Sequence, residues 1–415
     1  MKLAKTPPLS SSVLQFSVMG NLGVYIQVPF CQTKCTYCNF HTGVASPGRF
    51  APYAAAVCDE IRNHDRLLKS AGVNLSGDLR SPLPVVDTVY FGGGTPSLLE
   101  PELLNYMLQS LRDTFTCSFS EVTLEADPET VDAEKAAKWA AAGFHRISFG
   151  AQSFIDEELK AAGRMHRRED IYRAVPTLHS AGIHNISFDL IAGLPKQTHA
   201  SWRQSLGEAI ALSPEHISIY MMEIDEGSRL GLEVLQSGSR YSAKDLPAEE
   251  SMAEFFELGQ LELKSAGYRQ YEISNWAKPG LESRHNCKYW NREPYLGFGA
   301  GAHSFSGSQR WANRHDAAAY VGAISEGMSA IESVDALTPA LALEEELFLG
   351  LRQLSGIDLA RVERQYGVSL ADKVSELASR GMVEKPGDRL CLPADKLSVS
   401  NEVIVELLRS LQVTA

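Results

Sequence analysis

The sequence lacks the features that mark membrane-spanning, secreted and nucleic-acid-binding proteins. It contains no uninterrupted apolar run of about 18 residues, the length that a helix needs to cross a bilayer. Lys2 and Lys5 precede a stretch interrupted by Pro7 and Pro8, which does not form the apolar core of a signal peptide. The net charge is -12, whereas nucleic acid selects a basic surface. We therefore expect a cytoplasmic protein with no nucleic-acid partner and at most peripheral membrane contact.

Cysteine is scarce as well, with 7 residues in a chain of 415. Disulfide frameworks belong mainly to small secreted domains, so these thiols suit a reducing compartment. One of them, Cys58, lies on a predicted helix, where we expect it to fill the core. Three others are grouped at Cys31, Cys35 and Cys38, directly after the apolar, β-rich run 23–29. We expect that run to be a buried strand, with the three thiols on the loop that follows it.

The grouped thiols predict a metal centre on this loop. Iron–sulfur clusters are held by cysteine thiolates, and three thiolates can bind three irons of a [4Fe–4S] cube, which leaves the fourth iron open to a small ligand. The alternative is a structural zinc site, which needs four protein ligands and for which His41 is the candidate fourth. Disulfides explain the group less well, because three clustered cysteines cannot all pair. The spacing favours the iron–sulfur cluster.

Strand and helix patterns alternate through the first half of the chain. The predicted strands are residues 23–29, 85–91, 121–126, 145–152, 185–192 and 216–224. The predicted helices are residues 49–69, 101–114, 132–142, a segment containing Arg164, 171–181 and 201–212, and residues 74–84 are a predicted loop. Short connections of this kind indicate parallel βαβ units, so an incomplete (β/α)6 barrel and a doubly wound sheet both fit. In either fold, chemistry belongs at the C-terminal ends of the strands.

The pattern changes after residue 245, which suggests a second, smaller domain. The predicted elements there are a helix over 247–266, a strand over 268–274, helices over 342–354, 359–366 and 370–379, and a strand-like 389–392. The last four resemble a winged-helix module, which on an acidic chain fits packing or recognition better than DNA binding. We divide the chain into an N-terminal segment 1–22, an α/β domain 23–245 and a mixed α+β domain 246–415.

A glycine-rich turn, Gly92–Thr95, follows one predicted strand and precedes a helix. Glycines allow a backbone to approach a ligand closely and to offer its N–H and C=O groups. The turn has no lysine and is therefore not a phosphate-binding loop of the usual kind. Taken alone, it equally suits a tight strand-to-helix connection.

Polar side chains also stand near the C-terminal ends of three predicted buried strands. These are Glu125, Gln152 and Asp189. A buried carboxylate is costly without a partner, so each either bonds a ligand or pairs with a cation such as Arg146 or Arg164. Their equivalent positions on the strands favour a ligand site. By contrast, the dipeptide at 127–128 is predicted to be a turn.

The segment His285–Trp290 combines an imidazole, a thiol and two aromatic rings within a few residues. Histidine, cysteine, methionine and tyrosine are axial ligands of haem iron, and a flat macrocycle needs aromatic or aliphatic walls. The residues alone favour the alternative, a hydrogen-bonding segment between domains with Trp290 in the core. His303 and His315 are further candidate ligands with weaker claims.

The spacing Cys31-x3-Cys35-x2-Cys38, the turn 92–96 and the strand-end residues resemble the radical S-adenosylmethionine (SAM) superfamily. More narrowly, the chain is similar to the oxygen-independent coproporphyrinogen III oxidase-like proteins over about residues 23–400. The resemblance implies an incomplete (β/α)6 radical-SAM barrel followed by a smaller C-terminal domain. It also implies a [4Fe–4S] cluster whose open iron chelates SAM, which reduction would split to a 5′-deoxyadenosyl radical.

The resemblance assigns roles residue by residue. Cluster ligation falls to Cys31, Cys35 and Cys38. The SAM pocket falls to Tyr25, Tyr37, Gly93, Gly94, Thr95, Glu125, Gln152, Arg164 and Asp189.

Two departures separate this chain from the oxidase. Phe40 stands where the oxidase has a further cysteine, and only about twenty mostly polar residues precede the first strand. In addition, His285-Asn-x-x-Tyr-Trp290 matches the segment typical of the haem chaperone branch, HemW. The resemblance therefore implies a haem chaperone, with haem as cofactor, His285 in the haem site, and haem-accepting proteins such as respiratory enzymes as partners. The alternative is an enzyme that decarboxylates coproporphyrinogen III to protoporphyrinogen IX.

Overall fold

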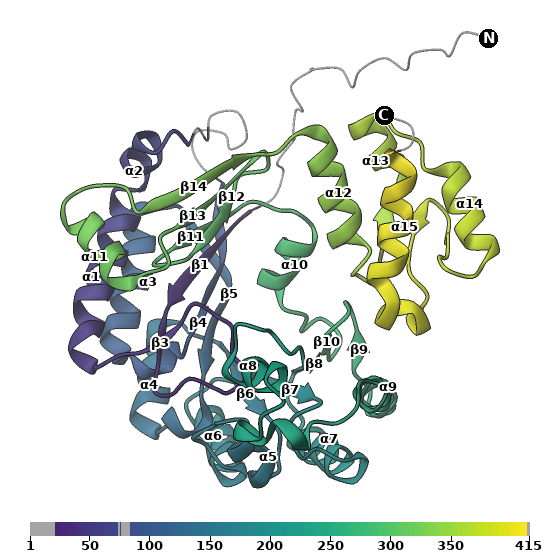
Figure 1. Ribbon diagram of the computed structural model, residues 1–415. Coiled ribbons are helices and arrows are strands. Elements are labelled where there is room, and N and C mark those ends of the chain that lie inside the picture. The colour runs from purple at the N-terminus through teal and green to yellow at the C-terminus, as the bar shows by residue number, and fades with distance from the viewer. Residues whose placement is uncertain (1–20, 74, 76–83, 413–415) are drawn as a thin grey trace.

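A curved, mostly parallel sheet carries the fold (Figure 1). The computed structural model describes residues 21–73, 75 and 84–412. Within these residues the sheet has 12 strands, in the order β14-β13-β12-β11-β1-β4-β5-β6-β7-β8-β10-β9. Its central parallel strands are β1 (Leu22–Val28), β4 (Val86–Gly93), β5 (Cys117–Ala126), β6 (Arg146–Gln152), β7 (Asn185–Ala192) and β8 (His216–Met221). The predicted parallel α/β organisation is confirmed, and each predicted strand of the first half is present.

Helices cover the outer face of these strands and bury their apolar sides against it (Figure 1). They are α1 (Phe50–Arg62), α2 (His64–Ser70), α3 (Pro101–Thr114), α4 (Ala133–Ala142), α5 (Asp156–Ala161), α6 (Arg168–Ser180) and α7 (His199–Leu212). Asp132 caps α4 by accepting a bond from the backbone N–H of Lys135, and Gly143 ends it in a left-handed conformation. In the described part of the chain, no helix has the length and apolar character needed to cross a membrane.

Three predicted elements need correction. The helix over 49–69 is two helices, because the chain leaves helical geometry at Asn63. Arg164 is not helical but lies in the connection between α5 and α6, next to Gly163 with φ 77°. The predicted strand over 268–274 is reduced to the two residues of β9 (Arg269–Gln270), and an antiparallel partner, β10 (Asn275–Ala277), begins just after that range. The predicted loop 74–84 falls mostly outside the described residues.

The sheet continues past residue 245 on both of its sides. Beside β1 it adds β11 (Tyr295–Phe298) in parallel, followed by antiparallel β12 (His303–Phe305), β13 (Gln309–Asn313) and β14 (Ile331–Ala336). Helix α8 (Arg229–Leu235) precedes this region. Helices α9 (Glu249–Ser265), α10 (Arg284–Trp290) and α11 (Ala317–Ser325) lie within it. The division of the chain at residues 245 and 246 stays a prediction.

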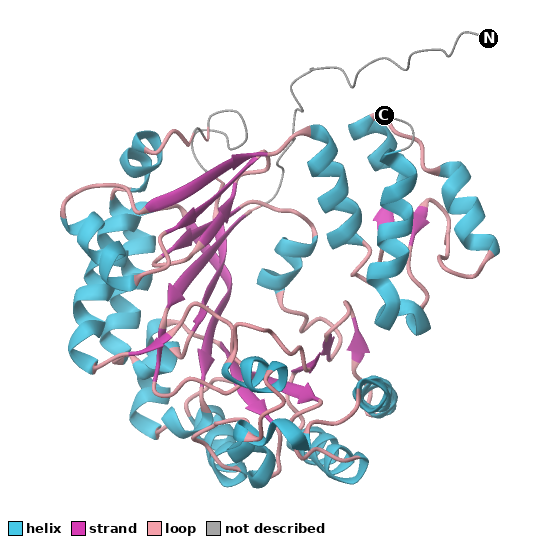
Figure 2. Cartoon of the chain, in the orientation of Figure 1, coloured by secondary structure: helices cyan, strands magenta, loops and turns pink. Residues whose placement is uncertain are grey.

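A smaller C-terminal unit has a hydrophobic core of its own, separate from that of the sheet. It consists of α12 (Pro339–Gly350), α13 (Leu359–Tyr366), α14 (Ala371–Ser379), α15 (Ser400–Gln412) and a two-stranded ribbon of β15 (Ile357–Asp358) and β16 (Arg389–Leu390) (Figure 2). Helices α13 and α14 match the predicted ranges to within one residue, whereas α12 begins three residues and ends four residues before the predicted range 342–354; a smaller second unit is confirmed. The winged-helix likeness stays a prediction.

Candidate functional site

The cysteine loop begins at the carboxyl end of β1. Its first cysteine, Cys31, ends the short strand β2 (Phe30–Cys31), which pairs with β3 (Gly43–Val44). The backbone of Thr36 holds the middle of the loop: its N–H donates to Ala162 O at 3.0 Å, and its carbonyl accepts from Leu230 N–H at 2.8 Å. The loop is therefore tied to the α5–α6 connection and to α8, far along the chain.

The three loop thiols suit a cube better than a single ion. Cys31, Cys35 and Cys38 are free and half-buried. Burial raises the pKa of the Cys31 thiol, and the neighbouring Cys38 and Cys35 raise it further. Among the described residues, no three His, Cys, Asp or Glu side chains are arranged to hold one metal ion. The ligands of a [4Fe–4S] cube bind different irons and need not meet at one point, so three loop thiols fit that group.

We call the C-terminal ends of β1, β4, β5, β6 and β7, with the loops that follow them, the carboxyl edge. At this edge the glycine turn packs closely on its neighbours. Gly93 has φ 111°, and a Cβ on Gly94 would lie 2.4 Å from Phe30 O, so larger residues do not fit. The Gly93 N–H donates to Glu125 Oε2 at 3.0 Å. The turn is thus fixed directly to the end of β5.

The carboxylate of Glu125 accepts hydrogen bonds from two donors, and its burial raises its pKa. Tyr90 OH donates to Glu125 Oε1 at 2.9 Å, and the Gly93 N–H bonds the other oxygen. Burial nevertheless raises the pKa of the carboxyl to about 7, with the nearby Asp189 adding to the rise. Asp189 itself accepts from Ser148 Oγ at 3.5 Å, and burial raises its pKa too. Two protonatable carboxyls therefore lie close together at the ends of β5 and β7.

Arg164 connects the cysteine loop with the strand ends. Its Nη1 donates to Cys35 Sγ at 3.5 Å, and its Nη2 donates to Gly150 O at 2.8 Å and forms an ion pair with Asp127. Thr95 Oγ1 also donates to Asp127, at 3.1 Å. The buried guanidinium thus positions the loop, β6 and the glycine turn relative to one another.

The remaining predicted pocket residues lie around the same edge. Gln152 ends β6 with φ 62°, a conformation that turns the chain sharply, and its side chain lies beside Gly150. Tyr25 OH donates to Gln27 Oε1 at 2.8 Å. Tyr37 packs against a small apolar cluster that includes Leu194 and Met222. The structure therefore brings together all the predicted residues except His285.

His285 lies on α10, where it packs against β4 away from the carboxyl edge. Its ring is 1% exposed, and its two nitrogens are hydrogen bonded with Thr88 Oγ1 at 3.0 Å and with Tyr289 OH at 2.8 Å. Burial lowers its pKa to about 3, and the charges of Lys288 and Arg146 lower it further, so the ring is neutral. Direct ligation of iron by His285 would require one of these two bonds to break.

The ring of His285 belongs to a series of aromatic side chains. Ring centroids are 6.0 Å apart for Tyr25 and Tyr90, 5.4 Å for Tyr90 and His285, 5.0 Å for His285 and Tyr289, and 4.6 Å for Tyr289 and Tyr295. We call these five rings the aromatic series. It runs from the carboxyl edge to α10 and β11.

The other candidate histidines lie on the surface beside the cysteine loop. His41, His303 and His315 are exposed, and the rings of His41 and His315 are 4.0 Å apart. Burial lowers the pKa of His303, and the charges of His315, Arg310 and His41 lower it further. These contacts bring together residues from the loop and from the far side of β11.

Two residues of the carboxyl edge were not predicted from the sequence. Asp127 does begin a turn, η3 (Pro128–Thr130), but its carboxylate also anchors Arg164 and Thr95. Tyr90 supplies a hydroxyl to Glu125 from within β4. Asp127 directly follows a strand that already carried a predicted residue, and that position was the available signal.

Sequence comparison identifies related proteins. The profile of the Radical SAM superfamily matches residues 25–209, and that of the HemN C-terminal domain matches residues 337–395. The chain is 33% identical over 385 residues to "Heme chaperone HemW" of Bacillus subtilis (strain 168), covering 91% of this chain and 97% of that protein. It is 34% identical over 366 residues to the protein of the same name from Synechocystis sp., covering 86% and 84%.

A solved structure shows the same fold. "Coproporphyrinogen III oxidase (HemN) from Escherichia coli is a Radical SAM enzyme" superposes with a TM-score of 0.77 at 22% identity, covering 93% of this chain and 90% of that one. The fold class predicted from the sequence is thereby confirmed, with a smaller C-terminal domain after the α/β part. The chain belongs to the radical SAM superfamily and, within it, to the family of the proteins named heme chaperone HemW.

Proposed function

We propose that the protein is a haem chaperone, which binds haem and passes it to acceptor proteins. The observation that carries this proposal is the near full-length similarity to proteins named "Heme chaperone HemW". Phe40 agrees with this proposal. By resemblance, the oxidase carries a further cysteine at this position, whereas this chain has a phenylalanine that is 66% exposed. Haem-accepting proteins, including respiratory enzymes, would be the partners, in the cytoplasm.

The carboxyl edge would hold the cofactors of the superfamily. Cys31, Cys35 and Cys38 would bind a [4Fe–4S] cluster, and Arg164 would keep the loop in place through its bond to Cys35. Such a cluster, when bound, supplies one-electron chemistry to SAM. An exchangeable SAM would be bound and oriented by the backbone of Gly93 and Gly94 and by the polar side chains of the edge: Tyr25, Tyr37, Thr95, Glu125, Gln152, Arg164 and Asp189.

His285 would act in the haem site through its neighbours. Its Nε2 is hydrogen bonded with Tyr289 OH, so the imidazole orients the phenol. Tyrosine is itself a haem ligand in some proteins. Because His285 also contacts Tyr90, a ring that bonds Glu125, the proposed haem site adjoins the proposed SAM pocket.

Haem titration followed by transfer tests the proposal. Purified protein, with and without the reconstituted cluster, is titrated with haem and then mixed with apomyoglobin as a haem acceptor. We expect saturable binding, transfer to the acceptor, and affinity about tenfold weaker in His285→Ala, a change of ~1.4 kcal/mol. The exposed His184→Ala is the matched control and should bind as wild type does.

The alternative function is decided by a separate assay. Anaerobic incubation of cluster-loaded protein with reductant, SAM and coproporphyrinogen III should leave the substrate unchanged. Formation of protoporphyrinogen IX would overturn the chaperone proposal in favour of the oxidase. Absence of saturable haem binding would contradict it as well.

A further inference from the structure

A cavity of about 370 Å³ lies between the sheet and α12, away from the carboxyl edge. It is lined by Tyr289, Tyr295, Phe305, Arg310, Glu345, Phe348 and Leu349, and we call it the α12 cavity. Figure 1 shows α12 next to α10 and the strands β11–β13, which supply the opposite walls. Ligand pockets usually measure roughly 300–1,000 Å³, so this one is large enough for an organic molecule.

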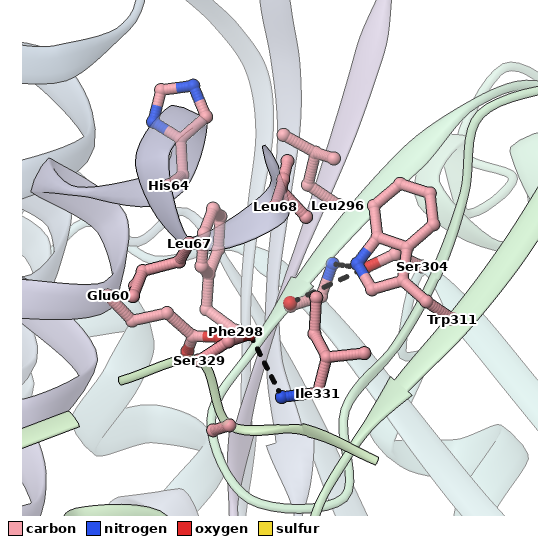
Figure 3. A pocket seen from close by; sticks show the side chains of 12 residues that line it. Glu60, His64, Leu67, Leu68, Leu296, Phe298, Ser304, Trp311, Ser329 and Ile331 are labelled. Atoms are coloured by element: carbon pink, nitrogen blue, oxygen red, sulfur yellow. Dashed lines mark hydrogen bonds between the residues drawn. The ribbon is translucent and has the colours of Figure 1, made fainter. Parts of the chain in front are cut away.

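A second pocket offers a useful contrast. It lies on the other side of the sheet, where Leu67, Phe298 and Trp311 surround a space of only about 20 Å³ (Figure 3). That is room for about one water molecule. One polar group of its wall is bonded within the wall: Ser304 Oγ accepts from Gly297 N–H at 2.8 Å. This pocket is a packing gap, whereas the α12 cavity is far too large to be explained as one.

The walls of the α12 cavity are aromatic on several sides. Tyr289 and Tyr295 meet edge to face at 4.6 Å, and the rings of Tyr295 and Phe305 are 6.3 Å apart. Phe348 contributes from α12 and is 38% exposed. Rings in these orientations suit a broad, flat, largely apolar molecule, because each face or edge can contact it.

The cavity wall itself carries Arg310 and Glu345, and these belong to an ion-pair cluster that also includes Arg292, Arg361 and Glu346, which lie outside the lining. Arg310 bonds both oxygens of Glu345 at 2.9 Å, and Arg292 Nε bonds the same carboxylate at 3.2 Å. Arg292 and Arg361 also pair with Glu346. Among the described residues of this cluster, three guanidinium groups thus face two carboxylates. One further carboxylate would balance the charge.

An unused hydrogen-bond donor supports that reading. Arg292 has a side chain only 5% exposed, and its buried Nη2 has no hydrogen-bond partner among the described residues. Its guanidinium lies 5.4 Å from the ring centroid of Phe305, a wall residue. Buried donors are normally satisfied, so this guanidinium, which lies next to the cavity but outside its lining, has capacity for one more acceptor.

We propose that the α12 cavity binds a tetrapyrrole through its carboxylate side chains, with Arg310 as the principal contact and the aromatic residues as walls. This inference rests on the proposed function and names the place where the cargo sits. Arg310 would exchange one bond to Glu345 for a bidentate bond to a propionate, the geometry for which a guanidinium is suited. Tyr289 joins this cavity to His285 through their hydrogen bond.

Esterified haem provides the test. Full-length wild type and Arg310→Gln are titrated with haem, with haem dimethyl ester and with iron-free protoporphyrin IX. We expect Arg310→Gln to bind haem and protoporphyrin about tenfold less tightly, while its affinity for the ester equals that of wild type. Arg314→Gln, which removes an exposed arginine just after β13, is the matched control and should change nothing.

A second pair of variants tests the apolar wall without touching the ion pairs. Phe348→Ala should weaken binding of all three ligands, whereas Leu341→Ala, an exposed residue on the same helix, should not. If wild type binds haem and both Arg310→Gln and Phe348→Ala bind it equally well, the cavity assignment is wrong and the proposed function stands. If wild type binds no haem saturably, the proposed function fails.

Discussion

The carboxyl edge and the α12 cavity are built in opposite ways. At the edge, residues come from equivalent positions at the ends of consecutive parallel strands, and backbone groups such as Gly93 N–H and Gly150 O share the hydrogen bonding. The cavity is instead lined by side chains from α10, three strands and α12. These elements come from two parts of the molecule that each have a hydrophobic core of their own. The edge follows from the repetition of strand–helix units, whereas the cavity follows from the packing of α12 against a part of the sheet that is distant from most of it in sequence. Variants that affect one region and spare the other therefore test the distinction.

Loss of a cluster cysteine should have the largest effect, and only at the edge. In Cys35→Ala, two remaining thiolates cannot hold a cube, so we expect iron and sulfide content to fall from about four per chain to near zero. Haem affinity measured without the cluster should not change. The control is Cys117→Ala, a free, half-buried thiol outside the loop. Full iron content in Cys35→Ala would contradict the assignment.

Removal of a strand-end carboxylate should have the next largest effect. Asp189→Ala deletes a charged hydrogen-bonding group, a loss of ~1.5–3 kcal/mol, which predicts SAM binding weaker by about 10–100-fold. Isothermal titration of cluster-loaded protein measures this directly. Iron content and haem affinity should match those of the exposed Asp372→Ala variant. Loss of iron in Asp189→Ala would instead indicate a structural role for the carboxylate.

The pH dependence of the unfolding free energy should show that Glu125 takes up a proton on folding. Burial raises its pKa to about 7, above about 4.3 in the unfolded chain, so the folded state keeps a proton that the unfolded state releases. The stability contributed by this group therefore falls as pH rises from about 4.5 to 7. Because Glu125 is only partly buried, water screens the effect to about 1–2 kcal/mol.

Urea unfolding of cofactor-free protein at pH 5.5 and pH 8 measures this contribution. Glu125→Gln keeps the shape of the side chain but does not titrate, so the difference between the two pH values should shrink by about 1–2 kcal/mol. An unchanged difference would mean that the carboxyl is ionised throughout. The cavity should be unaffected, since haem affinity at pH 8 is expected to equal that of wild type.

The smallest effect should come from one hydroxyl at the edge. Tyr25→Phe removes the hydrogen bond to Gln27 Oε1 and keeps the ring that stacks on Tyr90. We expect a loss of ~1 kcal/mol in unfolding free energy, with iron content unchanged. Denaturation in urea checks the stability, and a larger loss of haem binding than of stability would show that the two regions are coupled through the aromatic series.

The sequence predicted the carboxyl edge well because its signals are local and repeat. Each strand pattern ends in a polar residue or a glycine turn, and parallel strands place such ends at one edge. Asp127 was interpreted only as a turn, because an Asp-Pro pair is a strong turn signal that conceals a second role for the carboxylate. The helical pattern around Arg164 misses the break at Gly163, although a glycine with positive φ is a common way for a helix to end.

The α12 cavity could not be predicted in the same way. Its walls meet because β11 pairs in parallel with β1, whose residues lie far away in the sequence, and because α12 then docks on that side. No spacing or periodicity reports such a contact. Arg310 and Phe348 belong to ordinary strand and helix patterns, and only the three-dimensional arrangement brings the guanidinium and the ring to one space.

The joint between α12 and the sheet has a further consequence. Two arginines from the sheet side, Arg292 and Arg310, reach across to Glu345, so ion pairs fasten a wall of the cavity to its opposite side. Dissolved ions screen the partly exposed pair of Arg310 and Glu345 more than the pair of the buried Arg292 with the same carboxylate. Access to the cavity should therefore depend on ionic strength: a cargo that enters or leaves by parting this joint would exchange faster in concentrated salt, while the two cores stay folded.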